Sequence, residues 1–329
     1  MAHPSGPPVD LCLPLAYPSL CSPMQRRIRV SPRMPDQDKE EREMTVRITT
    51  LVENTAGWVN VLGEWGLSML VETDDCTFLS DTGASEATAR NARSLGVSLE
   101  SVEAVVFSHG HFDHTGGLLS LLPLIHKPVD VMGHPDIWAR KYAYHPGHKV
   151  CDYNTSSDYE YIGIPYAREQ SEKWGARFVM GSEPVWLSDT VVTSGEIPMR
   201  TEYETIDPML KVLVDGEYKP DALADDQSIF IKTDKGLVAV LGCAHRGIIN
   251  HLLRGQELTG IERVHAVIGG THLGPASRDR IEKTIRELKR MEVRLVAASH
   301  CTGLKAASAL EHEFGDSFVF NNSGTCITL

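Results

Sequence analysis

The stretch Ser108–Gly117, with the sequence SHGHFDHTGG, decides how the whole chain is interpreted. It follows directly after the apolar run Ala104–Phe107, which predicts a buried β-strand. Within six residues at the end of that strand lie three imidazoles and one carboxylate, which belong to His109, His111, Asp113 and His114. Polar rings packed beside a core strand are costly unless something pairs them. The stretch therefore predicts a binding site.

The spacing of these side chains suits metal ions. On a loop that leaves a strand, His109 and His111 can point at one position, and Asp113 and His114 at a neighbouring position. Gly110 lets the backbone bend closely between the first two. Neutral imidazole and carboxylate are suitable ligands for Zn²⁺, Fe or Mn²⁺. A surface histidine cluster is the alternative interpretation, and the density of ligands favours the metal site.

Three further histidines share one context. His245, His272 and His300 each follow an apolar run and lie near a glycine. Strand ends gather at one face of an α/β protein, where such proteins form their sites. We therefore expect His245 and His300 to complete a site for two adjacent metal ions. His272 is expected to be a further ligand, a substrate contact or a catalytic proton donor.

Four other residues near these positions are candidates for supporting roles. Asp81, which also follows a short predicted strand, could orient a ligand histidine through its free ring nitrogen, or could simply be a turn residue. Arg246 could clamp a phosphate or carboxylate of a substrate, or could be an ordinary surface arginine. Cys243 and Cys301 lie near the expected ligands, and we expect buried thiols there rather than ligands.

The rest of the chain alternates strands and helices. Short runs of Val, Ile and Leu lie close together in the first third, which suggests antiparallel pairing, and alternate with helical periods such as Ile281–Met291 in the last third. This predicts a layered α/β body with more than one sheet. Residues 1–43 carry 8 of the 18 prolines and are expected to be a disordered or non-native tail before a domain at 44–329. Residues 133–190 are expected to be an insertion, either a lid or a plain surface excursion.

Composition limits the kind of protein. The 329 residues are 42% apolar and 23% charged, which excludes a wholly disordered chain. The net charge of −12 argues against a nucleic-acid partner, and no uncharged apolar run is long enough for a membrane helix. Seven scattered cysteines without a C-x-x-C pair indicate a reducing compartment, the cytoplasm. We expect a small-molecule substrate, and the sequence leaves the oligomeric state open.

The motifs resemble those of a known superfamily. Ser108–Gly117 resembles the H-x-H-x-D-H signature of the metallo-β-lactamase superfamily, and Asp81–Gly83 resembles its first motif. From Met44 to the C-terminus the chain resembles the dihydropterin-phosphate-synthase-like branch of that superfamily. Its resembling stretches include Leu51–Asn54, Gly195–Pro198, Asp225–Gln227, Gly242–Asn250, Gly269–Leu273 and His300–Gly303.

The resemblance implies an αββα sandwich, two mixed β-sheets flanked by helices, with the metals at one edge. It implies His109 and His111 on one metal and Asp113 and His114 on the other, with His300 as the last superfamily histidine. The chain departs from the pattern at Gly242-Cys243, where many members carry a bridging aspartate.

These residues predict a metal-dependent hydrolase. Two divalent ions, with Zn²⁺ preferred and Fe, Mn²⁺ or Mg²⁺ as alternatives, would activate a bound hydroxide toward an ester, lactone or phosphoester. Asp113 would ligate a metal and hold the proton of the hydroxide, and His272 would protonate the leaving group. The branch implies an alternative, a transferase that joins a dihydropterin pyrophosphate to an aromatic amine. A non-catalytic metal sensor is the second alternative.

Overall fold

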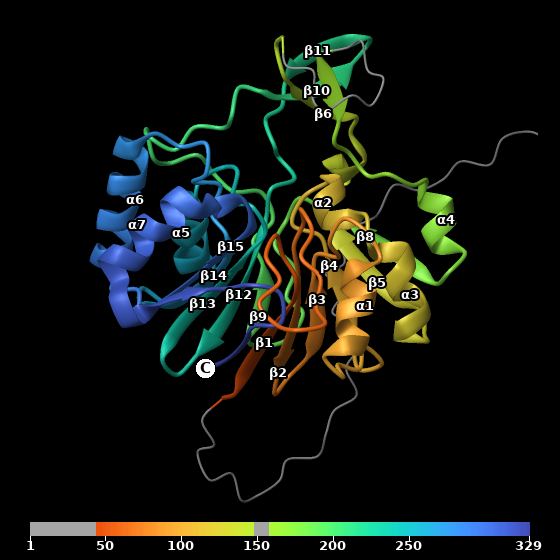
Figure 1. The fold of residues 1–329 in the computed structure, drawn as a ribbon, viewed down its shortest axis with the longest axis horizontal. Coiled ribbons are helices and arrows are strands. Elements are labelled where there is room, and N and C mark those ends of the chain that lie inside the picture. The colour runs from red at the N-terminus through yellow and green to blue at the C-terminus, as the bar shows by residue number, and fades with distance from the viewer. Residues whose placement is uncertain (1–43, 148–157) are drawn as a thin grey trace, which may run out of the picture. The chain divides into compact units, whose positions relative to one another are not determined.

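The computed structural model describes residues 44–147 and 158–329, and Figure 1 shows their arrangement. The expected N-terminal tail, residues 1–43, lies outside the described residues. Two sheets pack face to face in the centre, with helices on both outer faces. This arrangement confirms the expected αββα sandwich. No helix in the described ranges is both long enough and apolar enough to cross a membrane.

The first sheet has seven strands in the order β17-β1-β2-β3-β4-β5-β8. The strands β1, β2 and β3 pair antiparallel, as their close spacing in the sequence predicts, whereas β3, β4, β5 and β8 run parallel. Helices α1, α2 and α3 belong to this half, and the short helix α4 at Arg168–Glu172 packs against α3 and β8. The bounds are β1 Val46–Val52, β2 Ser68–Thr73, β3 Thr77–Ser80, α1 Ala87–Ser94, β4 Ala104–Val106, α2 Phe112–Thr115, α3 Leu118–Ile125, β5 Val129–Gly133, β8 Ala176–Met180 and β17 Cys326–Thr328.

The second sheet has six strands in the order β16-β15-β14-β13-β12-β9. Its strands β13 to β16 are parallel, and the long helices that connect them cover its outer face (Figure 1). The bounds are β9 Val191–Thr193, β12 Ser228–Thr233, β13 Gly236–Leu241, α5 Ile248–Thr259, β14 Val264–Gly270, α6 Arg278–Arg290, β15 Leu295–Ser299, α7 Gly303–Phe314 and β16 Phe318–Phe320, with short 3-10 turns at His300–Thr302 and Gly315–Ser317.

Helix α6 shows how the sequence specifies this half. Its apolar residues Ile281, Ile285 and Leu288 recur at helical spacing and are buried against the sheet. The apolar spacing predicts a helix from Ile281, whereas the observed helix begins at Arg278. The earlier start is explained by Ser277, whose side chain accepts a hydrogen bond from the backbone amide of Arg280 and caps the first turn.

A continuous apolar layer between the two sheets holds them together. It includes Ile48, Met69 and Phe78 from the first sheet and Ile229 and Val240 from the second, none more than 2% exposed. Fully burying a side chain of this kind contributes about 1.5–3 kcal/mol relative to leaving it exposed. The layer fixes the two sheets against each other, and with them the strand ends that carry the site.

A third sheet, which the sequence does not reveal, stands beyond the sandwich at the top of Figure 1. It has four antiparallel strands in the order β11-β10-β6-β7. The predicted insertion at 133–190 contributes β6 and β7 to this sheet but β8 to the first sheet. The bounds are β6 Lys141–Tyr144, β7 Tyr159–Tyr161, β10 Leu210–Val214 and β11 Glu217–Pro220, with a 3-10 turn at Pro135–Trp138 and α4 at Arg168–Glu172.

The parallel strands of both sheets end at one edge. Ser80 of β3 pairs with Val106 of β4, and Gly270 of β14 pairs with Ser299 of β15, so neighbouring strands end at the same level. The side chains that follow these ends therefore converge. They are Asp81 after β3, the loop of residues 108–114 after β4, Cys243 and His245 after β13, His272 after β14 and His300 after β15.

Candidate metal centre

His109, His111 and His245 form the first group of ligand atoms. Nε2 of His109 lies 2.9 Å from Nδ1 of His111 and 3.2 Å from Nε2 of His245. All three rings are buried. Burial, together with neighbouring cationic groups, holds the pKa of each well below its ordinary value, so all three are neutral, which is the form that binds a metal.

Asp113, His114 and His300 form the second group beside the first. Nε2 of His300 lies 3.2 Å from Nε2 of His114 and 3.2 Å from Oδ2 of Asp113. Helix α2 presents Asp113 and His114 in its single turn, and His300 comes from the end of β15. Burial lowers the pKa of His114, but the carboxylates of Asp81 and Asp113 outweigh it and raise that pKa to about 9. The second group is therefore a place where positive charge is favourable.

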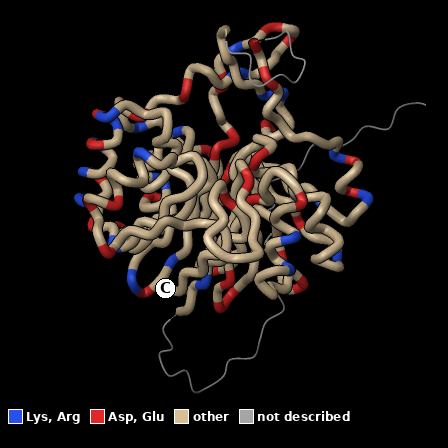
Figure 2. Tube along the Cα trace, in the orientation of Figure 1, with Lys and Arg blue, Asp and Glu red and all other residues tan. Residues whose placement is uncertain are grey.

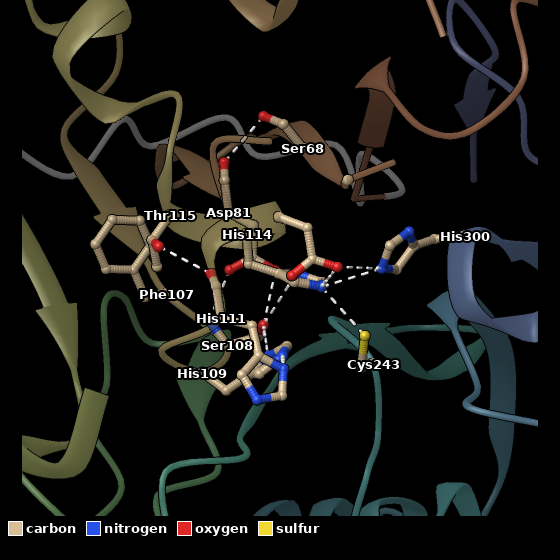
Figure 3. Close-up of polar contacts among 12 residues, drawn as sticks. Ser68, Asp81, Phe107, Ser108, His109, His111, His114, Thr115, Cys243 and His300 are labelled. Atoms are coloured by element: carbon tan, nitrogen blue, oxygen red, sulfur yellow. Dashed lines mark hydrogen bonds and ion pairs between the residues drawn. The ribbon is translucent and has the colours of Figure 1, made fainter. Parts of the chain in front are cut away.

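Cys243 lies between the two groups. Its Sγ atom is 3.1 Å from Nε2 of His114 (Figure 3). The same sulfur forms a potential ligand cluster with His245 and His272. Burial raises the pKa of this thiol well above its ordinary value, whereas a bound cation deprotonates a coordinating thiol. The side chain is buried, as the sequence predicts, but it is placed like a ligand. The departure at Gly242-Cys243 is the sequence signal that points to it.

Asp81 and Ser108 fix the protons on two ligand rings. Oδ2 of Asp81 lies 2.7 Å from Nδ1 of His114 and accepts the Ser108 hydroxyl at 2.7 Å. The hydroxyl has one proton, so it accepts from Nδ1 of His109, 2.9 Å away. Nδ1 is therefore the donor in both rings, and in the neutral, metal-binding form each ring turns its Nε2 lone pair inward. Gly242 leaves space for the Ser108 hydroxyl that joins His109 to Asp81, since a Cβ at position 242 would lie 2.0 Å from Ser108 Oγ.

The loop before β2 orients His300 in the same way. Oδ1 of Asn54 lies 2.8 Å from Nδ1 of His300 and also accepts the backbone amide of Gly66, which identifies it as the amide oxygen. Nδ1 of His300 is then the donor, and its Nε2 lone pair faces Asp113. The Glu53 carboxylate accepts the backbone amide of His300 at 3.1 Å.

These tautomers show that the residues fit cations. Nε2 of His114 faces Nε2 of His300 at 3.2 Å beside the Asp113 carboxylate, and this arrangement is stable only with a positive charge among the three groups. The raised pKa of His114 supplies that charge as a proton on Nε2, and a metal ion would take the place of this proton. Among the described residues, Nε2 of His111 and Nδ1 of His245 are buried without a hydrogen-bond partner. Nitrogen, carboxylate and thiolate donors together suit Zn²⁺.

Strained backbone marks the same edge. Non-glycine residues rarely have positive φ angles, yet φ is 59° at Asp81, 54° at Ala244, 47° at His272 and 51° at His300. Each such residue costs of order 1–3 kcal/mol, and such residues cluster at functional sites. The strained residues are therefore the ones that orient the candidate side chains or lie next to them.

The remaining predicted residues lie close by. The ring of His272 has its centroid 4.2 Å from that of His245, and both of its nitrogens are buried without a partner in the described ranges. The backbone amide of Arg246 donates to Asp226 at 2.7 Å, and its Nε atom is likewise buried without a described partner. The structure therefore brings Asp81, Cys243, Cys301 and His272 to the six expected ligands, whereas Arg246 is linked to them only as the residue that follows His245.

A buried ion-pair cluster behind the loop is not predicted from the sequence. The backbone amide of Gly110 donates to Asp225 at 2.8 Å, and Nζ of Lys141 lies 2.9 Å from both Asp225 and Asp221. Lys141 comes from β6, so the third sheet helps to hold the loop between His109 and His111. Asp225 lies in one of the stretches that carry the resemblance, whereas nothing in the sequence marks Lys141.

Comparison with known proteins identifies the class. Residues 66–163 match the model of the metallo-beta-lactamase superfamily, and the chain belongs to that superfamily. Within it, the chain is similar to the 7,8-dihydropterin-6-methyl-4-(beta-D-ribofuranosyl)-aminobenzene-5'-phosphate synthase of Methanocaldococcus jannaschii. The two are 32% identical over 291 residues, which cover 86% of this chain and 96% of the synthase. The resemblance predicted from the sequence is thereby confirmed.

Solved structures agree with the fold. A crystal structure of a metal-dependent hydrolase of the beta-lactamase superfamily superposes with a TM-score of 0.71 at 28% identity, covering 86% of this chain and 98% of that one. The metallo-beta-lactamase fold protein YhfI from Bacillus subtilis shares the fold with a TM-score of 0.50 at 14% identity, covering 87% of this chain and 100% of that one.

Proposed function

We propose that this chain is a metal-dependent transferase that joins a dihydropterin pyrophosphate to an aromatic amine. The similarity to the synthase over 96% of its length supports the alternative reaction implied by the sequence. The observation that carries the proposal is structural: two groups of three ligands lie side by side, and His300 of the second group lines a cavity of about 690 Å³. Such a cavity is large enough for a substrate with ring systems.

We propose two divalent ions, with Zn²⁺ preferred over Fe, Mn²⁺ or Mg²⁺. His109, His111 and His245 would hold one ion, and Asp113, His114 and His300 the other, with Cys243 as an added candidate ligand between them. When bound, divalent ions supply Lewis acidity and neutralise the charge that develops on a leaving pyrophosphate. Figure 2 shows Asp and Glu positions in the centre of the molecule, and buried carboxylates there favour cations.

The chain's own residues position and protonate the reactants. Asp81, through Ser108 and His114, keeps the ligand rings in the tautomers described above. In the transfer, the carbon–oxygen bond to pyrophosphate breaks, a carbon–nitrogen bond to the amine forms, and the amine loses a proton. We assign proton transfer to His272, because its ring nitrogens are buried beside the ligands and without a described partner. Arg246 is proposed to contact an anionic part of the substrate.

Hydrolysis of an ester, lactone or phosphoester is the second candidate. It is favoured by the similarity to the metal-dependent hydrolase, with its TM-score of 0.71. The complete ligand set speaks against the non-catalytic sensor. We further propose a small-molecule substrate and a cytoplasmic location, which the free thiols of Cys76, Cys243, Cys301 and Cys326 support.

The amine dependence of pyrophosphate release distinguishes the two candidates. Zinc-loaded protein is incubated with a dihydropterin pyrophosphate, with and without an aromatic amine, and pyrophosphate and coupled product are both quantified. Transfer predicts pyrophosphate only when the amine is present, with one coupled product per pyrophosphate. Pyrophosphate release without amine, or activity only on an ester and phosphoester panel, would replace transfer by hydrolysis. A loaded protein inert in every assay would refute both.

A further inference from the structure

The cavity beside the second ligand group has the size of a substrate site. Its volume is about 690 Å³, and its wall includes His272, His300 and Cys301. Residues 53–55, Trp65 and the start of α7 form other parts of the wall. The cavity therefore opens directly onto residues that we assign to metal binding and proton transfer.

Large apolar side chains face this cavity and are exposed to it. Trp65 is 60% exposed, Leu304 84% and Phe320 40%, and all three line the cavity. The Trp65 ring has its centroid 5.2 Å from the His300 ring. Aromatic side chains exposed around a concave surface mark binding sites, because a bound planar ring would cover them and stack on them.

Buried polar atoms in the same wall have no partner among the described residues. Oγ of Ser299 is one, in a residue only 6% exposed, and the two ring nitrogens of His272 are the others. A buried hydroxyl or imidazole without a hydrogen bond carries a free-energy cost, because it has lost its bonds to water. A ligand with a hydrogen-bonding edge would remove this cost.

The charge of the wall selects against an anionic group. No lysine or arginine occurs among the described residues that line the cavity. Its one carboxylate, Glu53, is already engaged, because its oxygens accept the backbone amides of Thr55 at 2.6 Å and His300 at 3.1 Å. A phosphate or pyrophosphate would therefore meet no lysine or arginine in the cavity, whereas a neutral ring would meet matching apolar and polar surfaces.

We propose that this cavity binds the neutral, planar heteroaromatic ring of the substrate, with Trp65 stacking on its face and Ser299 and His272 bonding to its edge. The anionic part of the substrate then lies toward the two ligand groups. This inference rests on the proposed function, because it places the ring of a substrate whose reacting bond lies at the metal ligands. It names Trp65 and Ser299 as specificity-determining residues for the reaction.

Binding of a ring without phosphate tests the site independently of catalysis. The probe is 6-hydroxymethylpterin, titrated by calorimetry into chelator-treated protein, with inorganic pyrophosphate as the comparison ligand. We expect the pterin to bind and pyrophosphate to fail to compete with it. Trp65→Ala is expected to weaken pterin binding about tenfold, since it removes both the burial of the pterin ring and its stacking on the indole. Ser299→Ala is expected to weaken it severalfold.

Matched variants make the outcome decisive. Trp58→Ala removes an equally exposed tryptophan, 66% exposed, that does not line the cavity, and should bind the probe as wild type does. Trp65→Phe should restore most of the affinity. If transfer activity is present but Trp65→Ala and Ser299→Ala leave both the KM and pterin binding unchanged, the ring lies elsewhere and this inference is wrong while the proposed function stands. If the pterin binds as predicted but no transfer occurs, the proposed function fails instead.

Discussion

Replacing Asp81 by Asn should weaken the second ligand group most. The Asp81 carboxylate takes part in three hydrogen bonds of 2.7 Å, with Nδ1 of His114 and with the backbone amide and hydroxyl of Ser108. Two of these donors meet at Oδ2 and one at Oδ1. An amide has only one oxygen, so in either orientation its NH₂ group faces at least one donor. In one orientation the NH₂ group faces Nδ1 of His114 and the Ser108 hydroxyl, and both lose their acceptor. In the other it faces the backbone amide of Ser108, which loses its acceptor.

The loss can be estimated from partners of this kind. Removing a group that orients a ligand histidine lowers metal affinity about 10- to 100-fold, or about 1.4–2.7 kcal/mol. The assay titrates zinc-loaded protein with a chromophoric chelator. In Asp81→Asn, the ion of the His114 group should be released at a chelator concentration about 10- to 100-fold lower than in the wild type. The ion of the His109 group should be released only at a higher chelator concentration. Asp130→Asn, which removes a carboxylate paired with Arg177 at 2.7 Å on the surface, should match the wild type.

Two results would refute this reasoning. One is an Asp81→Asn protein that holds both ions with wild-type affinity. The other is a variant that weakens the ion of the His109 group while sparing that of the His114 group. If Asp81→Asn fails to fold, Ser108→Ala provides the second test, because it removes the hydroxyl that links Asp81 to His109 and leaves the contact between Asp81 and His114 in place.

Three further predictions concern the centre and the cluster behind it. His109→Ala should lose bound metal and nearly all activity, because Nε2 of His109 faces both His111 and His245; a variant that keeps both would show that the site is misplaced. Cobalt-substituted protein should show a thiolate-to-cobalt charge-transfer band that Cys243→Ser abolishes and Cys76→Ser keeps, because Cys76 belongs to no ligand cluster of the described residues, and persistence of the band in Cys243→Ser would remove Cys243 from the ligand set. Lys141→Met should cost about 3–5 kcal/mol in a denaturant titration, since it leaves the buried carboxylates of Asp221 and Asp225 unpaired. Lys219→Met, at an exposed pair with Glu217, should cost less than about 1 kcal/mol, and equal losses in both variants would contradict the ion-pair argument.

Local patterns account for the parts that the sequence predicts. The strands before His109 and His300 are short apolar runs, and strand ends meet at one edge, so the convergence of these histidines follows from the order of elements. Helix α6 follows from apolar spacing and its Ser277 cap. The antiparallel pairing of β2 with β3 follows from the short connection between them, whereas β1 and β2 pair across the longer loop of residues 53–67.

Long-range packing accounts for what the sequence does not predict. The third sheet pairs β6 with β10, some 70 residues later, and no local pattern encodes that pairing. Lys141 becomes important only because this sheet brings it to Asp225. The sequence around Cys243 predicts only a buried thiol, and the fold alone places its sulfur 3.1 Å from Nε2 of His114. The cavity likewise exists only where Trp65, Ser299 and Phe320 meet.

The metal content per chain tests the central claim most directly. Protein purified without chelator and without added metal is analysed by mass spectrometry of the metals, together with its His109→Ala and Asp113→Asn variants. The account predicts about two divalent ions per chain in the wild type, loss of metal in His109→Ala, and selective loss of one ion in Asp113→Asn. A wild-type chain that binds no metal even after reconstitution would contradict the account.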